Sequence, residues 1–258
     1  MSEPRALRVA IILIGNELLS GKIEDLNAVY LIKRLRALGA SVERVVMIPD
    51  TFEEIIPEVK ALSERFDVVF TSGGVGPTHD DITLEAIGRS LARPLVKSHE
   101  LHELITGYFK EQTTEAHLRM SHVPEGTELL WGAEAGERRG WPVFHLENLY
   151  ILPGVPKLFK AKFEQIAERF RCGSFSLSSL YLNAEEGLIA AYLSEAEALF
   201  SVQIGSYPRF EREAPYRVRV TIEARSPEPV AEALEWLRER VVSNPQLGPQ
   251  TLVEPPPF

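Results

Sequence analysis

A glycine-rich segment at residues 71–85 carries the residue types best suited to chemistry in this chain. It follows an apolar run that ends at Phe70 and precedes a helical pattern that starts near Ile82, so the predicted order is strand, turn and helix. Glycines let the backbone pass close to a ligand and point successive N–H groups inward, a geometry suited to phosphate. The start of the following helix adds unpaired N–H groups. The residues predicted to bind phosphate here are Ser72, Gly73, Gly74, Gly76, Thr78 and Thr83.

Two adjacent carboxylates, Asp80 and Asp81, lie beside this predicted anion site. They would repel a phosphate unless a cation lies between them, which indicates an oxygen-liganded divalent ion such as Mg²⁺. The alternative is that an Asp or Thr near Ile82 only caps the helix, since glycine turns are common between strands and helices. The segment is not a Walker loop, because no Lys follows the last glycine. It is not a dinucleotide fingerprint, because Pro77 breaks the required spacing.

The flanking elements predict the fold that positions these residues. Residues 8–14 form a continuous apolar run typical of a central parallel strand, and further strands are expected at 41–48 and 67–71. Helical spacing at 28–38 and 53–65 makes strands and helices alternate. This alternation predicts an α/β domain with a doubly wound, mostly parallel sheet.

Ligands of such sheets bind beyond the carboxyl ends of the strands. Three polar elements are expected at that edge: the turn from Gly15 to Gly21, Asp50, and the glycine-rich segment. Glu17 lies in the first turn and faces the same crevice, or else interacts with the dipole of the following helix. Asp50 is either part of the site or a turn residue after Pro49. The agreement of the three elements predicts one shared site.

A change of pattern near residues 171–174 predicts a domain boundary. The elements after it follow the order β-α-β-β-α, which indicates a small α+β module with helices on one face of an open sheet. The last residues carry five prolines and are expected to be extended or disordered. The predicted domains are therefore residues 1–172 and 173–243, followed by a proline-rich tail at 244–258.

Composition limits the classes of function. The chain has 258 residues, a net charge of −9 and a pI of about 5.3, so binding to nucleic acid or acidic lipid is not expected. The single cysteine, Cys172, excludes an intrachain disulfide and a cysteine-rich zinc site. The sequence has neither an apolar stretch of membrane-spanning length nor an apolar signal core near its start, so a cytoplasmic protein is expected.

The segment from Gly73 to Thr83 resembles the signature of the MoaB/MogA-type molybdopterin-binding fold. Within that fold it is most similar to the N-terminal part of CinA, the competence/damage-inducible protein, and to the molybdopterin-binding-like domain of eukaryotic FAD synthase. Further matching motifs are Gly15–Gly21 with Asn27, Asp50, Leu152–Pro156 and Ile204–Pro208. The stretch from Trp131 to Phe144 is more similar to the FAD synthase branch.

The resemblance implies a metal-dependent pyrophosphatase that acts on ADP-ribose or FAD-like dinucleotides. Asp50, Asp80 and Asp81 are then the catalytic candidates. Asp80, Asp81 and Glu17 would hold the divalent ion, and a monovalent cation is a further candidate. The other candidates at the substrate pocket are Gly15, Glu17, Pro153 and Gly154. The resemblance also implies a homodimer, because related proteins are similar to dimers.

Two other functions stay open. One is molybdopterin binding or adenylyl transfer in molybdenum-cofactor biosynthesis. The other is a non-catalytic nucleotide- or RNA-binding module, because residues 175–242 are similar to a KH-type module. The acidic pI and the absence of a Gly-x-x-Gly loop there disfavour RNA. Neither the CinA deamidase activity nor FAD synthesis is expected, because the chain has no segment that corresponds to either catalytic domain.

Overall fold

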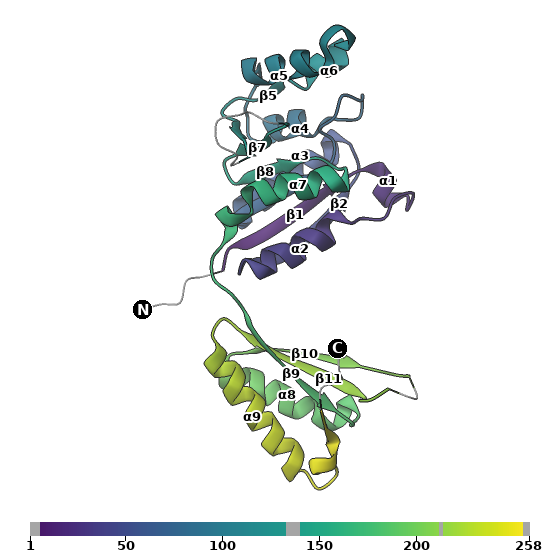
Figure 1. Cartoon of the computed structure of the whole chain (residues 1–258), viewed down its shortest axis with the longest axis vertical. Coiled ribbons are helices and arrows are strands. Elements are labelled where there is room, and N and C mark those ends of the chain that lie inside the picture. Colours follow the sequence, from purple (N-terminus) through teal and green to yellow (C-terminus); the bar gives the residue numbers. More distant parts are fainter. Residues whose placement is uncertain (1–5, 133–139, 212–213, 255–258) are drawn as a thin grey trace. The chain divides into compact units, whose positions relative to one another are not determined.

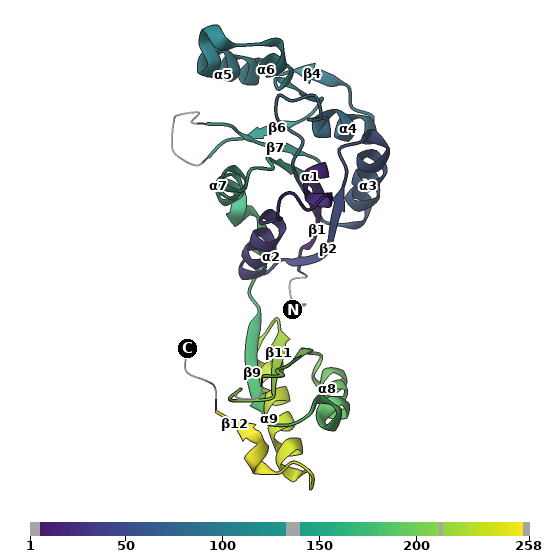
Figure 2. The same cartoon turned by 90° about the vertical axis from the view of Figure 1, so that its right-hand side faces the viewer.

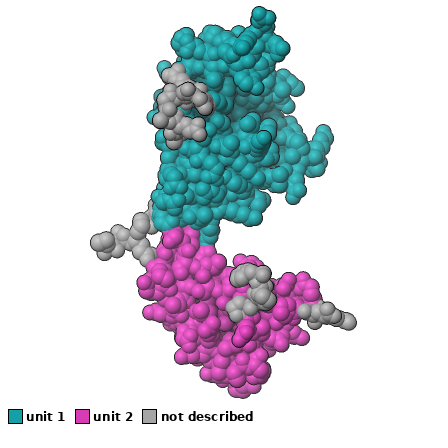
Figure 3. Space-filling view, in the orientation of Figure 1, with its two compact units in different colours: residues 1–173 teal, residues 174–258 magenta. Residues whose placement is uncertain are grey.

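The structure is a computed structural model that describes residues 6–132, 140–211 and 214–254. The chain divides into two compact units, residues 1–173 and 174–258 (Figure 3). Each unit has its own sheet and its own hydrophobic core. Each therefore has the elements of an independent domain.

The first unit is built on a six-stranded sheet with the order β2-β1-β3-β8-β7-β6. Strands β2, β1, β3 and β8 are parallel, β7 pairs antiparallel with β8, and β6 pairs antiparallel with β7 (Figure 1). The strand bounds are β1 Arg8–Ile14, β2 Ser41–Ile48, β3 Val68–Ser72, β6 Glu128–Leu130, β7 Val143–Leu146 and β8 Leu149–Leu152. The predicted α/β fold with a doubly wound, mostly parallel sheet is confirmed.

Helices cover both faces of this sheet, and β1 is buried on both sides as its apolar sequence predicts. Side chains alternate along a strand, so Val9 and Ile11 enter one core while Ala10 and Ile12 enter the other. Helices α2 and α7 pack on the first face, and α3 and α4 on the second. The bounds are α1 Asn16–Leu19, α2 Asn27–Ala37, α3 Phe52–Arg65, α4 Thr83–Ser90 and α7 Pro156–Ile166, which continues as a 3-10 turn at Ala167–Phe170.

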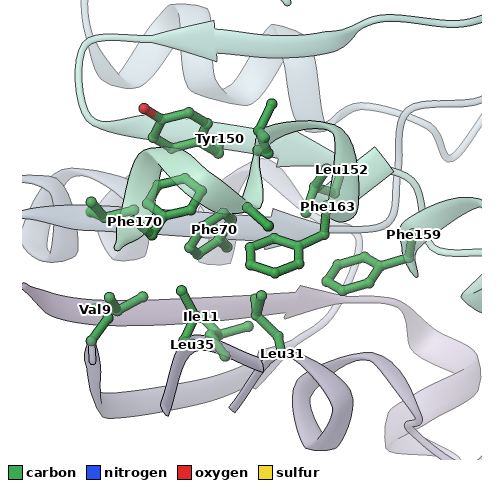
Figure 4. Close-up of a cluster of buried hydrophobic side chains, with 14 of the residues drawn as sticks. Val9, Ile11, Leu31, Leu35, Phe70, Tyr150, Leu152, Phe159, Phe163 and Phe170 are labelled. Atoms are coloured by element: carbon green, nitrogen blue, oxygen red, sulfur yellow. The ribbon is translucent and has the colours of Figure 1, made fainter. Parts of the chain in front are cut away.

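Aromatic rings fill the first core between the sheet and α7 (Figure 4). The ring centroid of Phe70 lies 5.0 Å from that of Phe170 and 5.7 Å from that of Phe163. Tyr150 adds a further ring contact to Phe170 at 4.9 Å. Such edge-to-face contacts hold α7 in a defined orientation on the sheet. They place the start of α7, at Pro156, directly after the carboxyl end of β8.

A smaller group of elements follows α4 in sequence. Its bounds are β4 Leu95–Lys97, α5 His99–Phe109, a 3-10 turn at Lys110–Gln112, α6 Glu115–Arg119 and β5 His122–Pro124. Strands β4 and β5 pair antiparallel, and Figure 1 shows α5 and α6 beyond α4 at one end of this unit. Leu101 and Ile105 of α5 are fully buried, and Leu101 joins the second core. The inner side of α5 is thereby fixed against the rest of the unit.

The second unit is a four-stranded antiparallel sheet with the order β10-β11-β9-β12 and two helices (Figure 2). The bounds are β9 Ser176–Leu182, α8 Glu186–Phe200, β10 Gln203–Pro208, β11 Val218–Ala224, α9 Pro227–Ser243, a 3-10 turn at Pro249–Thr251 and β12 Leu252–Val253. The predicted β-α-β-β-α order is present. Val218, Val220 and Ile222 of β11 alternate into a core shared with α8 and α9, so the helices cover one face of the sheet.

The prediction of an extended or disordered tail from residue 244 is wrong for its described part, which ends at Glu254. Leu247 is 4% exposed and belongs to the core of the second unit. Leu252 pairs with Leu182 of β9, so β12 adds a fourth strand. The proline content led to the wrong prediction. Pro249 is in fact the first residue of a 3-10 turn, a position where the backbone N–H would not be hydrogen-bonded within the turn. Residues 255–258 lie outside the described residues.

The longest described helix is α9, with 17 residues. In the ranges that the structure describes, no helix combines the length and apolar character that a bilayer span requires.

The packed tail makes a stability prediction. We expect Leu247→Ala to lower the free energy of unfolding of the second unit by about 2–3 kcal/mol, because it removes a large apolar side chain from a closed core. Chemical denaturation followed by tryptophan fluorescence measures the change, since Trp236 packs against the same core. Val242→Ala, at a position 40% exposed, is the control and should change the value by at most about 0.5 kcal/mol. Equal effects of the two variants would show that the tail does not contribute to the core.

Candidate functional site

A cavity of about 840 Å³ lies at the carboxyl ends of β1, β3 and β8. Strand register brings these ends together, because Leu13 pairs with Ser72 and Ser72 pairs with Leu152. The predicted site residues that line the cavity are Glu17, Asp50, Ser72, Gly73, Gly74, Gly76, Thr78, Asp80, Asp81, Pro153 and Gly154. Gly15 and Thr83 are not part of the lining, and each supports a residue that is.

The glycine loop has a backbone conformation that residues with a side chain rarely adopt. Gly73 and Gly74 have φ values of +107° and +66°. A Cβ on Gly73 would lie 2.2 Å from the carbonyl oxygen of Ile14, and one on Gly74 would lie 2.2 Å from Thr83 Oγ1. These two glycines are therefore required by the close approach of β1 and α4, in addition to any ligand.

Three successive N–H groups of this loop are available to a ligand. Within the described residues, the N–H groups of Gly74, Val75 and Gly76 have no hydrogen-bond acceptor, whereas Gly73 N–H donates to Leu152 O at 3.2 Å. Consecutive N–H groups in a loop with positive φ form a concave site for anions. The loop therefore has the predicted geometry of a phosphate-binding turn.

Thr83 supports the loop from behind. It is fully buried at the first residue of α4, and its hydroxyl donates to Gly73 O at 3.0 Å while its N–H donates to Gly74 O at the same distance. Its predicted contact with phosphate is replaced by this positioning role. Gly15 leaves room for the Glu17 side chain, because a Cβ on Gly15 would lie 2.5 Å from a carboxylate oxygen of Glu17.

Asp81 closes the loop on itself. Its Oδ2 accepts hydrogen bonds from the N–H of Thr78, at 2.8 Å, and from the Thr78 hydroxyl. The residue that precedes α4 is Ile82, and no side chain caps that helix, so the capping alternative for Asp81 does not apply. A Cβ on Gly76 would lie 2.7 Å from Asp81 Oδ2, so the glycine leaves room for this carboxylate. Asp81 thus shapes the same loop that exposes the free N–H groups.

Asp50 holds the first turn of α1 at the cavity. Its Oδ2 accepts from the N–H of Asn16 at 2.9 Å, which places the neighbouring Glu17 in the cavity wall. The pKa of Asp50 is raised, mainly by burial, while the Asn16 hydrogen bond lowers it and the negative charges of Glu17, Asp80 and Asp81 raise it further. Four carboxylates therefore interact electrostatically at this end of the cavity. Their mutual repulsion favours a bound cation.

The donor set fits a hard divalent cation shared with a phosphate. Among the described residues, no three Asp, Glu, His or Cys side chains are grouped closely enough to hold a metal ion by themselves. Mg²⁺ in phosphate-binding sites takes one or two carboxylates and completes its shell with phosphate oxygens and water. Asp80 and Asp81 beside the loop N–H groups match that pattern. His79, in contrast, is almost fully exposed and 3.9 Å from Asp80.

Asn27 belongs to the first-loop motif found in the sequence, which did not indicate what its side chain does in the site. It is 5% exposed, lines the cavity, and its Nδ2 donates to Ser72 Oγ at 2.9 Å and to Gly154 O at 2.7 Å. These bonds join the end of β3 to the turn after β8. Its Oδ1 is buried and has no partner within the described residues, so it can accept a hydrogen bond from a ligand.

Part of the cavity lining is apolar, and no sequence motif predicted it. This part comes from four segments that are distant in sequence: α5, the residue after α6, the turn near Trp141 and the start of α7. The apolar lining residues are Leu104, Ile105, Tyr108, Phe109, Met120, Trp141, Val155 and Leu158. Apolar and aromatic walls next to a phosphate-binding end are typical of sites for nucleotides and other ring-containing ligands.

Fold and site together define a class: doubly wound α/β proteins with a glycine loop and a cavity at the carboxyl edge of the parallel strands. Residues 10–171 match a family described as "Probable molybdopterin binding domain", and the chain belongs to that family. Residues 174–245 match a second family, described as "FAD synthase, middle domain". Both matches fall within the two compact units of the structure.

Individual relatives agree with this assignment. The chain is 37% identical over 230 residues to a protein of Archaeoglobus fulgidus, covering 89% of this chain and 96% of that protein. It is 30% identical over 266 residues to "Probable FAD synthase" of Caenorhabditis elegans, of which it spans about half, 51%. The crystal structure of CinA from Thermoplasma acidophilum is similar at a TM-score of 0.57 and 27% identity, over 64% of this chain and 98% of that one. The predicted resemblance to CinA and FAD synthase is confirmed.

The raised pKa of Asp50 predicts a pH-dependent stability effect. Its folded-state pKa lies above the unfolded value of about 3.9, so the folded protein loses stability as pH rises from that value through the folded pKa. Asp50→Asn removes the charge and keeps an oxygen that can accept from Asn16. We expect this variant to have a higher Tm than the wild type at pH 7, with the difference vanishing toward about pH 4. Calorimetry across this pH range tests it; a lower Tm at neutral pH would show that the Asn16 bond outweighs the repulsion.

Proposed function

We propose that the first unit is a metal-dependent pyrophosphatase that hydrolyses a dinucleotide such as ADP-ribose or FAD. The observation that supports the proposal is that hydrogen-bond donors for a phosphate and carboxylates for a cation line the same cavity. These are the unpaired N–H groups of residues 74–76 and the carboxylates Glu17, Asp50, Asp80 and Asp81. A diphosphate with a cation suits that end, and a base or flavin ring suits the apolar end. The similarity to FAD synthase supports a ligand of this kind.

In this proposal each group of residues has a separate role in binding or catalysis. The loop N–H groups bind the oxygens of one phosphate, and Asp80 and Asp81 hold the divalent cation beside it, with Glu17 as a further ligand. When bound, the cation neutralises phosphate charge and lowers the pKa of water. Asp50 accepts a proton from the attacking water, since its raised pKa makes it a better base. The water oxygen bonds to one phosphorus, the bond from that phosphorus to the bridging oxygen breaks, and two monophosphates leave.

Molybdopterin binding, with or without adenylyl transfer, is the second candidate function. It is favoured by the description of the matched family. The loop would then bind the phosphate of the pterin, and the apolar half of the cavity would receive its ring system. A purified protein that retains a fluorescent pterin through gel filtration would favour this function over hydrolysis.

Metal removal is the first test of hydrolysis. We expect excess chelator to abolish the release of AMP from ADP-ribose or FAD, and added Mg²⁺ or Mn²⁺ to restore it, because the carboxylates otherwise repel the substrate. A screen of both substrates against several divalent ions, with and without K⁺, follows AMP by chromatography. Full activity in chelator would rule out the metal role, and no AMP with any ion would rule out the pyrophosphatase.

Asp81→Asn separates the charge of Asp81 from its role in the loop. The Asn oxygen can still accept from the Thr78 N–H, so we expect an unchanged Tm and a kcat reduced by roughly 10²-fold or more. Asp67→Asn is the matched control, because Asp67 also accepts from a backbone N–H, that of Arg8, at the opposite edge of the sheet. The control should keep full kcat. A lower Tm of Asp81→Asn with normal kcat would show that Asp81 serves only the loop.

A further inference from the structure

Lys162 is a buried cation in the cavity wall for which the proposed reaction has no use. It lies on α7, is 7% exposed and lines the cavity together with Trp141 and Leu158. Within the described part of the chain, the one hydrogen-bond partner of its Nζ is Gln165 Oε1, at 3.3 Å on the same helix. Burial lowers the pKa of Lys162.

This arrangement is unfavourable for the protein alone. A buried ammonium group loses its solvation by water, and a single neutral amide oxygen does not replace an opposite charge. Two other lysines of α7, Lys157 and Lys160, are exposed. At position 162 an apolar side chain would continue the buried face formed by Phe159 and Phe163. Among the described residues none supplies an opposite charge to Lys162, and the cavity is a route by which an anionic ligand can reach it.

The position of Lys162 separates it from the glycine loop. Helix α7 starts at Pro156, next to Gly154, where a Cβ would lie 3.3 Å from the Cα of Gly73. Lys162 is six residues further along α7, a rise of roughly 9 Å at 1.5 Å per residue. Trp141 and Leu158 line the same cavity. A ligand can therefore contact the loop with one group and Lys162 with another.

We propose that Lys162 binds a second anionic group of the ligand, distinct from the diphosphate at the glycine loop. The inference rests on the proposed function for the diphosphate and adds a specificity determinant to it. The ligand class is a dinucleotide with a further negative charge. That charge is either a phosphate group on a ribose or an ionised ring, such as that of reduced flavin. A dinucleotide without this charge leaves the ammonium group unpaired and binds less tightly.

The first experiment asks whether Lys162 serves the fold. We expect Lys162→Met, measured without ligand, to have a Tm equal to or above that of the wild type, because it removes a buried unpaired charge. Lys157→Met is the matched control on the exposed side of α7 and should leave Tm unchanged. A Tm of Lys162→Met several degrees below both would assign Lys162 a structural role and overturn the proposal.

The second experiment measures affinity for matched ligands by rapid mixing with Mg²⁺ present, before any of the ligand is hydrolysed. NADPH and NADH differ by one ribose phosphate, and reduced and oxidised FAD differ in the charge of the flavin ring. We expect the wild type and Lys157→Met to bind the more anionic member of at least one pair at least roughly tenfold more tightly, about 1.4 kcal/mol. Lys162→Met should lose that preference, and Lys162→Arg should keep part of it. The pair that responds identifies the source of the negative charge.

The outcomes distinguish this inference from the proposed function. A preference that Lys162→Met abolishes supports the inference even if no ligand is hydrolysed with any metal. Hydrolysis of a dinucleotide with no preference in either pair overturns the inference and leaves the pyrophosphatase intact. A preference that persists in Lys162→Met, or a wild type that binds none of the four ligands, also overturns it.

Discussion

The register of three parallel strands is the constraint on which the site depends. Leu13, Ser72 and Leu152 lie side by side at the ends of β1, β3 and β8, so the chain leaves the sheet three times at one edge. Because β1 is buried on both faces, a shift of one residue would exchange its two sets of core side chains. The hydrophobic cores on both faces therefore determine which polar turns meet at the cavity.

Local hydrogen bonds then convert that edge into a binding surface. Asn27 joins the end of β3 to the turn after β8, and Asp50 holds the first turn of α1. Asp81 and Thr83 brace the glycine loop from its two ends. These groups form hydrogen bonds that fix the shape of the site, while the N–H groups of residues 74–76 have no acceptor among the described residues. The site is thus organised before any ligand binds, which reduces the entropy lost on binding.

Electrostatics divides the cavity into two halves. Four carboxylates gather at the loop end, where the pKa of Asp50 is raised mainly by burial and further by the charges of Glu17, Asp80 and Asp81. Elsewhere in the cavity wall Lys162 is buried with no opposite charge among the described residues, and burial lowers its pKa. In the proposed function and in the inference about Lys162, ligands of the matching charge would relieve both arrangements. Functional sites commonly retain unfavourable groups of this kind because the rest of the fold supplies the stability.

Local sequence determined much of this protein by itself. The apolar runs and helical spacings predicted the alternating elements and the parallel sheet, and the glycine segment predicted the turn between a strand and a helix, because strand period, helix period and glycine turns are local properties. Sequence did not predict the packing of the tail around Leu247, since a two-residue strand has no period to detect. It also could not distinguish Thr83, which supports the loop from behind, from Thr78, which lines the cavity, because both follow the glycines. Only the tertiary structure brought Tyr108, Trp141 and Lys162 to one cavity: they come from segments far apart in the chain, and the packing of α5 and α7 decides which way they face.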